Sequence, residues 1–186
     1  MEPFLVTVLA LVLAQDARPA AERVLPGQPQ PKVVSRTPPQ YPEKAKGARL
    51  TGTVVMDVTV GTDGRVSDVQ VLRGIPLLSR AAVSAVRELR YEPLLLDGKP
   101  LPFVIPVTTV FNVAGPQLNA GDLTRLIQSK DVELSESAAA FVGEQARHFS
   151  SGDKKKLAEV LQRILGGKPP AGLKAAATKA LSDLEE

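Results

Sequence analysis

The chain has 186 residues, of which 44% are hydrophobic and 23% charged, with a net charge of +3, no cysteine and one histidine. This is the composition of an ordinary globular protein with room for one medium domain or two small ones. The lack of cysteine and the single His148 argue against a thiolate or His-rich metal site and against a Ser-His-Asp triad. The weak net charge argues against nucleic acid, and no cofactor is expected.

An apolar run, FLVTVLALVLA, occupies residues 4–14 and is followed by polar residues. As a helix it would be about 16 Å long, roughly half of the hydrocarbon core of a bilayer. It ends in Val12-Leu13-Ala14, which suits a signal peptidase, although Glu2 replaces the usual basic residues before it. Residues 1–14 are interpreted as a signal peptide or a truncated membrane anchor. We expect export to the periplasm or cell envelope, with anchoring to the inner membrane as the other option.

Residues 15–35 are rich in proline, and Pro38-Pro39 continue the pattern. Proline removes backbone donors and favours extended polyproline II, so we interpret residues 15–35 as a tether that forms no ladder.

Residues 36–114 predict an α+β domain. In Thr53–Val60 the apolar residues alternate, and Gly61–Gly64 supplies a hairpin turn before a second strand, Val66–Arg73. The period then changes to that of an amphipathic helix over Leu77–Leu89. A turn at Asp97-Gly98 precedes a last strand, with a short helix expected before the first. The order helix, strand, strand, helix, strand predicts a three-stranded antiparallel sheet.

The last strand, Phe103–Val113, contains Pro106. Proline cannot donate to a ladder, so this strand is expected at an edge or a bulge. An edge strand presents a row of unpaired N–H and C=O groups, which can accept a further strand from a partner.

Residues 116–186 predict a small all-α region. Four helical stripes follow one another around Leu123–Ile127 (with a cap at Asp122), Leu134–Phe149, Leu157–Leu165 and Leu173–Leu184. Gly166-Gly167 is expected to end the third. No function is indicated for this region.

Five short motifs lie in order along residues 36–114. They are Gln40-Tyr41-Pro42, Gly52-Thr53-Val54, Asp63-Gly64-Arg65-Val66, Arg90-Tyr91-Glu92-Pro93 and Gly98-Lys99-Pro100. Together, on this order of elements, they resemble the C-terminal domain of the TonB family. Leu89 stands where the family often has tryptophan, the apolar run lacks the family's anchor histidine, and the helical region is atypical.

The resemblance implies a cell-envelope energy transducer without catalytic activity. Such a protein binds an extended, TonB box-like segment of an outer-membrane TonB-dependent transporter, which adds as a strand beside the last strand and supports energy-coupled transport. It also implies inner-membrane motor proteins as partners if the chain is anchored. The partner-binding residues expected from this resemblance are Gln40, Tyr41, Pro42, Arg90, Tyr91, Val104, Val107, Thr109 and Phe111.

Two other functions stay open. The first is a motor-free envelope adaptor that binds another envelope protein or peptidoglycan. The second is a hydrolase, which needs paired acids in a cleft, whereas Asp57, Asp63 and Asp68 fall on strand surfaces and a turn. A homodimer formed by exchange of strands is also left open.

Overall fold

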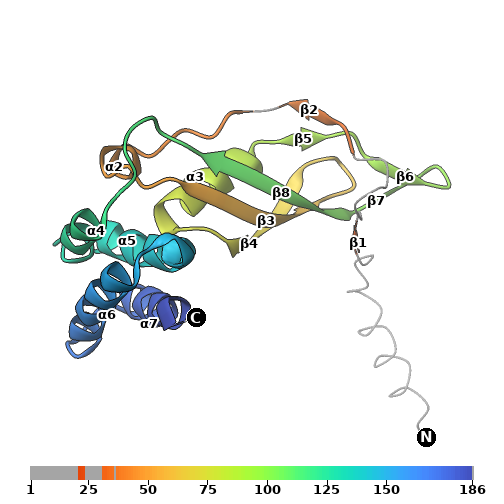
Figure 1. The fold of residues 1–186 in the computed structure, drawn as a ribbon. Coiled ribbons are helices and arrows are strands. Elements are labelled where there is room, and N and C mark those ends of the chain that lie inside the picture. The colour runs from red at the N-terminus through yellow and green to blue at the C-terminus, as the bar shows by residue number, and fades with distance from the viewer. Residues whose placement is uncertain (1–20, 24–30, 36, 186) are drawn as a thin grey trace, which may run out of the picture.

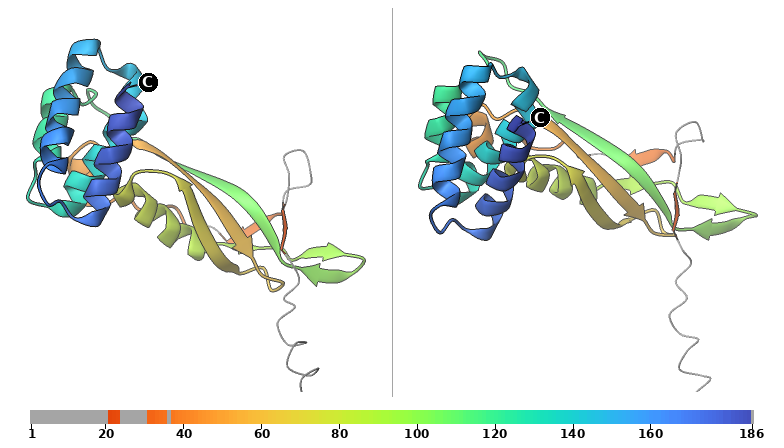
Figure 2. Two further views of the ribbon diagram at one scale, coloured as in Figure 1. Left: turned by 90° about the horizontal axis from the view of Figure 1, so that it is seen from below. Right: turned by 60° about the horizontal axis from the view of Figure 1, so that its bottom comes forward.

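Figure 1 shows the computed structural model, which describes residues 21–23, 31–35 and 37–185. A twisted sheet with one long helix on its face forms one part, and a group of helices packs at one end of it (Figures 1 and 2). The predicted signal peptide or anchor at residues 1–14 lies outside the described residues. Among the helices that the structure describes, none is both long and apolar enough to cross a membrane.

The sheet is built on β3 (Gly52–Val60), β4 (Val66–Arg73) and β8 (Phe103–Phe111), which are antiparallel in the order β8-β3-β4. Alternation in β3 turns one row of side chains fully into the core, namely Val54, Met56, Val58 and Val60. The predicted α+β class and three-stranded antiparallel sheet are confirmed. Alternation in Val66–Arg73 predicts that Val69 and Val71 point inward, but Val71 is 40% exposed. β4 is the other edge of the sheet, and its register on β3 is irregular.

Two helices belong to this domain: the short α2 (Glu43–Gly47) and α3 (Pro76–Arg87). Pro76 occupies the first turn of α3, where a missing N–H costs nothing. The apolar stripe of α3 lies against the inner face of the sheet, and its buried residues are Leu77, Leu78, Ala82 and Val86. The predicted amphipathic helix is therefore confirmed.

The connection from α3 to β8 contains β5 (Arg90–Tyr91) and a hairpin of β6 (Leu94–Leu96) and β7 (Lys99–Leu101). Asp97 and Gly98 form its turn with positive φ angles of 51° and 76°, as a type I′ turn requires. The predicted turn is confirmed. The hairpin projects beyond the sheet at the end opposite the helices (Figure 2).

The proline-rich region contributes two short strands, β1 (Glu22–Arg23) and β2 (Val33–Ser35). β1 pairs in parallel with the start of β8, and β2 pairs with β5. The prediction that this region forms no ladder is wrong for these five residues, because they fall in gaps between prolines. With β1 included, the sheet order is β1-β8-β3-β4.

The C-terminal part folds into α4 (Ala120–Ile127), α5 (Val132–Gln145), α6 (Ser151–Leu165) and α7 (Ala171–Glu185), with a short 3₁₀ turn after α5. This confirms the four predicted helices, and α6 ends directly before the two glycines as expected.

The N-cap of α4 differs from the prediction. Asn119, not Asp122, caps this helix, and its side-chain oxygen accepts a hydrogen bond from the Asp122 N–H at 2.9 Å. The helix begins at Ala120, directly after the Asn119 cap and before the first leucine of the apolar stripe. Asp122 therefore lies in the first turn, where its charge favours the helix dipole.

Helix α5 packs against α3 and supplies the cap that α3 lacks. Ile75, the N-cap residue of α3, offers no capping side chain. Instead, the Ser137 Oγ of α5 accepts a buried hydrogen bond of 3.1 Å from the Leu77 N–H. One otherwise orphaned donor of α3 is thus satisfied from a distant part of the chain, which fixes α5 against the sheet domain.

Replacing Ser137 with alanine is expected to lower the free energy of unfolding by about 1–3 kcal/mol, because it leaves the buried Leu77 N–H without an acceptor. Ser79 is the matched control. Its Oγ is buried with no hydrogen-bond partner among the described residues, so Ser79→Ala should be neutral or slightly stabilising. Urea denaturation of both variants checks this, and equal effects of the two would disprove the capping role.

Ion pairs surround the same contact. The Lys44 Nζ of α2 lies 2.7 Å from Asp131 Oδ2 and 3.3 Å from Glu133 Oε2, at the start of α5. Arg80 of α3 also pairs with Glu133. These groups are partly exposed, so each pair contributes little stability by itself. Their arrangement matches basic groups of the sheet domain with the acidic first turn of α5.

Glu144, near the end of α5, faces Arg73 at the end of β4, with 3.7 Å between Oε1 and Nε. Burial raises the pKa of the Glu144 carboxyl, while the charges of Arg73 and Lys179 oppose the shift. Because the folded state holds this proton more tightly than the unfolded state, ionisation of Glu144 lowers stability as the pH rises above the ordinary value of 4.5.

The free energy of unfolding of wild type minus that of Glu144→Gln is therefore expected to increase as the pH is lowered from about 7 towards the ordinary pKa of Glu. Denaturation of both proteins across this range measures the difference. The contributions of the other carboxylates cancel, because both proteins contain them. A difference that stays constant or decreases would show that the carboxyl is not desolvated.

Candidate functional site: the open edge of β8

The site lies along the side of β8 that faces away from β3. β1 covers only the start of this side, at Phe103 and Val104. For the rest of β8, no described residue pairs with it on that side. The predicted edge strand is present, with its first two residues covered.

The direction of the backbone groups follows from Pro106. Facing pairs in an antiparallel ladder alternate between hydrogen-bonded and non-hydrogen-bonded. Pro106 has no N–H, and the register of β8 on β3 is unbroken, so its nitrogen is placed away from β3. Thr108 and Val110 lie two and four residues after Pro106, so their backbone groups point to the same side of the strand as those of Pro106. Their N–H and C=O groups therefore point to the open side, whereas those of Val107 and Thr109 point to β3.

A groove of about 300 Å³ runs beside this edge. One wall is the backbone of β8 from Val107 to Val110, and the other is the segment Thr37–Pro39. Ala85, Val86 and Leu89, from the end of α3 and the residues after it, complete the lining. The groove thus combines open backbone groups with small apolar side chains, the combination that strand addition uses.

Tyr41 fixes the chain at one end of the groove. Its hydroxyl donates a 2.7 Å hydrogen bond to the Leu50 carbonyl, and its ring meets the edge of the Phe111 ring, with centroids 5.5 Å apart. Burial raises the pKa of the Tyr41 hydroxyl, so the group remains a donor. Gln40 and Pro42, with the outer side of α3, line an adjoining hollow of about 670 Å³.

Residues 37–113 match the family model described as Gram-negative bacterial TonB protein C-terminal. Residues 37–113 form a TonB C-terminal domain. The protein TonB of Escherichia coli is 38% identical over 87 residues, which are 46% of this chain and 34% of that protein. The protein TonB of Klebsiella pneumoniae is 32% identical over 102 residues, 54% of this chain and 40% of that protein. The chain thus covers little more than a third of the length of these relatives.

A solution structure of the Pseudomonas aeruginosa TonB C-terminal domain is also similar. It is 25% identical in sequence, covers 53% of this chain and 99% of that chain, and has a TM-score of 0.43.

Five of the residues predicted to bind a partner line the groove or the hollow beside it. Val107 and Thr109 line the groove, and Gln40, Tyr41 and Pro42 line the adjoining hollow.

The other predicted residues are placed differently. Val104 pairs with β1, and Arg90 is half-buried, with its guanidinium donating to the Leu89 carbonyl. Tyr91 and Phe111 are only 5% and 4% exposed, so little of either ring is open to a partner, and partner binding at these two positions stays a prediction. Both complete the core through edge-to-face aromatic pairs, Tyr91 with Phe103 and Phe111 with Tyr41.

The expected partner-binding residues do not include Thr108, Val110 or the wall Thr37–Pro39, which also line the groove. The position of Pro106 would have identified Thr108 and Val110, because the backbone groups of these three alternate residues point to one side of the strand. The wall could not be predicted, since nothing in its sequence fixes where it crosses α3.

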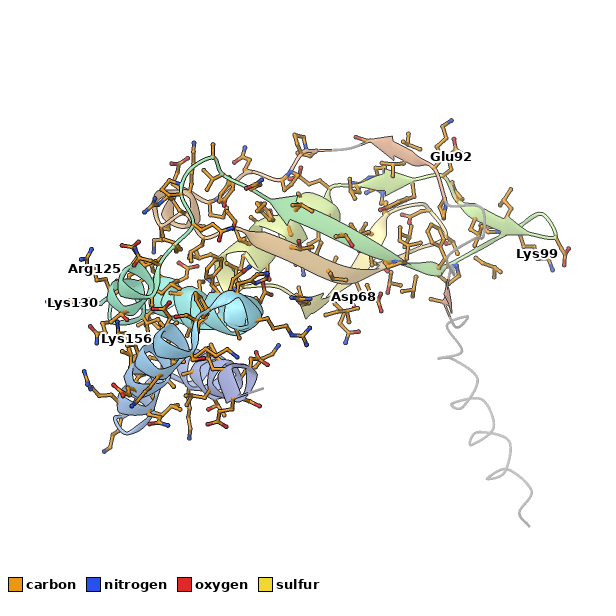
Figure 3. All side chains as sticks on the ribbon, viewed as in Figure 1. Asp68, Glu92, Lys99, Arg125, Lys130 and Lys156 are labelled. Atoms are coloured by element: carbon orange, nitrogen blue, oxygen red, sulfur yellow. The ribbon has the colours of Figure 1, made fainter. Side chains whose placement is uncertain are left out.

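The structure places two of the acidic residues considered for a hydrolase, Asp63 and Asp68, on a turn and on a strand. Asp63 lies in the first hairpin turn with Arg65 beside it, and Asp68 extends from the β4 side of the sheet (Figure 3). The described residues contain no group of three His, Asp or Glu side chains suited to a metal ion.

Proposed function

We propose that this chain binds an extended segment of an outer-membrane TonB-dependent transporter, which adds as a strand to β8, and that it thereby supports energy-coupled transport. The observation that carries the proposal is the open edge of β8 beside an apolar groove in a TonB domain. Each hydrogen bond to Thr108 or Val110 contributes about 0.5–1.5 kcal/mol net. The role is one of binding, not catalysis.

The proposed setting is the periplasm or cell envelope, with residues 15–35 linking the domain to the N-terminal segment. Inner-membrane motor proteins are partners in this proposal only for an anchored form of the protein. Intact-mass measurement on separated cell fractions tests the setting. A mature N-terminus near Gln15 in the soluble periplasm would contradict motor coupling, and an intact Met1 in the cytosol would contradict export.

A second candidate function is a motor-free envelope adaptor. The observation that favours it is the helical region, a second folded surface fixed to the TonB domain through Ser137.

One experiment separates the two. Peptides that match the extended N-terminal segments of transporters encoded in the same genome are titrated into the full chain, and a scrambled peptide serves as control. Sequence-dependent binding supports the transporter. Absence of binding, together with capture of an envelope protein by the helical region alone, supports the adaptor. Sedimentation of the unbound chain reports whether a homodimer forms.

A further inference from the structure

A second cavity lies where the TonB domain meets the helical region. Its volume is about 400 Å³, within the roughly 300–1,000 Å³ of small-molecule sites. It is lined by residues of the connection between α2 and β3, by the connection from Asn112 to Ala120, and by residues around the end of α5 and the start of α6. Since both parts of the chain supply its walls, it exists only because the helical region is docked. It is separate from the β8 groove, and the inference does not depend on strand addition.

Arg49 is the cation of this cavity. It follows α2 with a φ angle of +54°, and its N–H and that of Leu50 bond back to Lys46 and Ala45 at 3.0 and 2.9 Å. This is the position at a helix end that favours glycine. A non-glycine residue is strained there, and the residue in this position is an arginine that lines the cavity. Yet Arg49 forms no ion pair in the part of the chain that the structure describes.

The remaining lining defines what Arg49 could bind. Asn112 and Gln145 add side-chain amides, and His148 lies at the exposed side. The one acidic residue, Asp153, is already engaged, because its carboxylate accepts a 2.7 Å hydrogen bond from Ser150 and it lies in the first turn of α6. The apolar part of the wall is formed by Leu118, Phe141 and Phe149.

We propose that this cavity binds a small carboxylate with an apolar body, and that Arg49 is its anion-binding residue. The planar guanidinium matches a carboxylate in a two-point hydrogen bond. The aromatic wall covers the apolar body, and Asn112 and Gln145 supply further donors. A ligand with the same body but no charge gains only the contact with the wall.

The test uses 4-phenylbutyrate and, as its uncharged match, 4-phenylbutyramide, titrated into the isotopically labelled full chain by NMR. The carboxylate is expected to shift the backbone amides of Asn112, Gln145 and Phe149, and the amide to bind at least tenfold more weakly. Arg49→Gly should weaken carboxylate binding at least tenfold while its melting temperature stays equal or rises, because glycine relieves the positive φ. Arg49→Gln, which keeps the length without the charge, should show the same loss.

The inference is overturned if the carboxylate shifts no amide around the cavity, if the amide binds equally well, or if both variants bind like the wild type. Shifts confined to Thr108 and Val110 would also overturn it and would leave the function of the β8 edge standing.

Discussion

Thr108→Pro is expected to abolish detectable binding of a transporter segment while leaving the stability of the domain nearly unchanged. The substitution removes an N–H that points to the open side of β8 and places a ring in the path of an added strand. The ladder with β3 does not use this N–H, because Thr108 has the same parity as Pro106. Loss of the hydrogen bond and blockage of its neighbours should weaken binding at least tenfold. Calorimetric titration measures the affinity, and urea denaturation the stability.

Two variants serve as controls for this result. Thr108→Val keeps the N–H and the shape, so binding should remain within about threefold. Thr109→Pro removes an N–H that bonds to β3, so this variant should lose stability. Undiminished binding by a folded Thr108→Pro protein would mean that the partner does not add as a strand to β8.

Gly64→Ala is expected to lower the free energy of unfolding by roughly 3 kcal/mol or more. Gly64 has a φ angle of +73°, and an added Cβ would lie 2.0 Å from the Tyr91 carbonyl oxygen. In the same turn, the Gly64 carbonyl accepts a 2.9 Å hydrogen bond from the Tyr91 N–H. The new methyl group therefore forces the first hairpin away from β5, adding a backbone collision to the strain of positive φ. Urea denaturation measures the loss.

Gly98→Ala is the matched control, because it has nearly the same φ angle, +76°, with no atom within 4 Å of an added Cβ. It should cost only about 1 kcal/mol, the strain of the left-handed conformation alone. Equal losses for the two variants would show that the contact between the turn and Tyr91 is not tight.

The parts of the fold that depend on local pattern were predictable from the sequence. Alternation in Thr53–Val60 gives the buried face of β3, and the glycines at 64 and 98 give two turns with positive φ. Pro106 correctly indicates an edge strand, because its missing donor excludes a central position. These features need only near neighbours in the chain.

The parts that depend on contacts between distant residues were not predictable. Ser137 reads as an ordinary helix residue, and only its position opposite the start of α3 makes it a cap. Tyr91 resembled a contact residue through its motif, although its ring fills the core against Phe103. Pairing of β1 with β8 also joins residues about 80 positions apart in sequence, and no local pattern specifies such a contact.

The most direct measurement of the central claim is amide hydrogen exchange of the full chain with and without a transporter segment. Without the segment, the Thr108 and Val110 amides should exchange quickly, and those of Val107 and Thr109 slowly, because they bond to β3. Addition of the segment should slow exchange at Thr108 and Val110 selectively. Protection that appears instead along β4, or no change at either residue while the segment is bound, would contradict strand addition at β8.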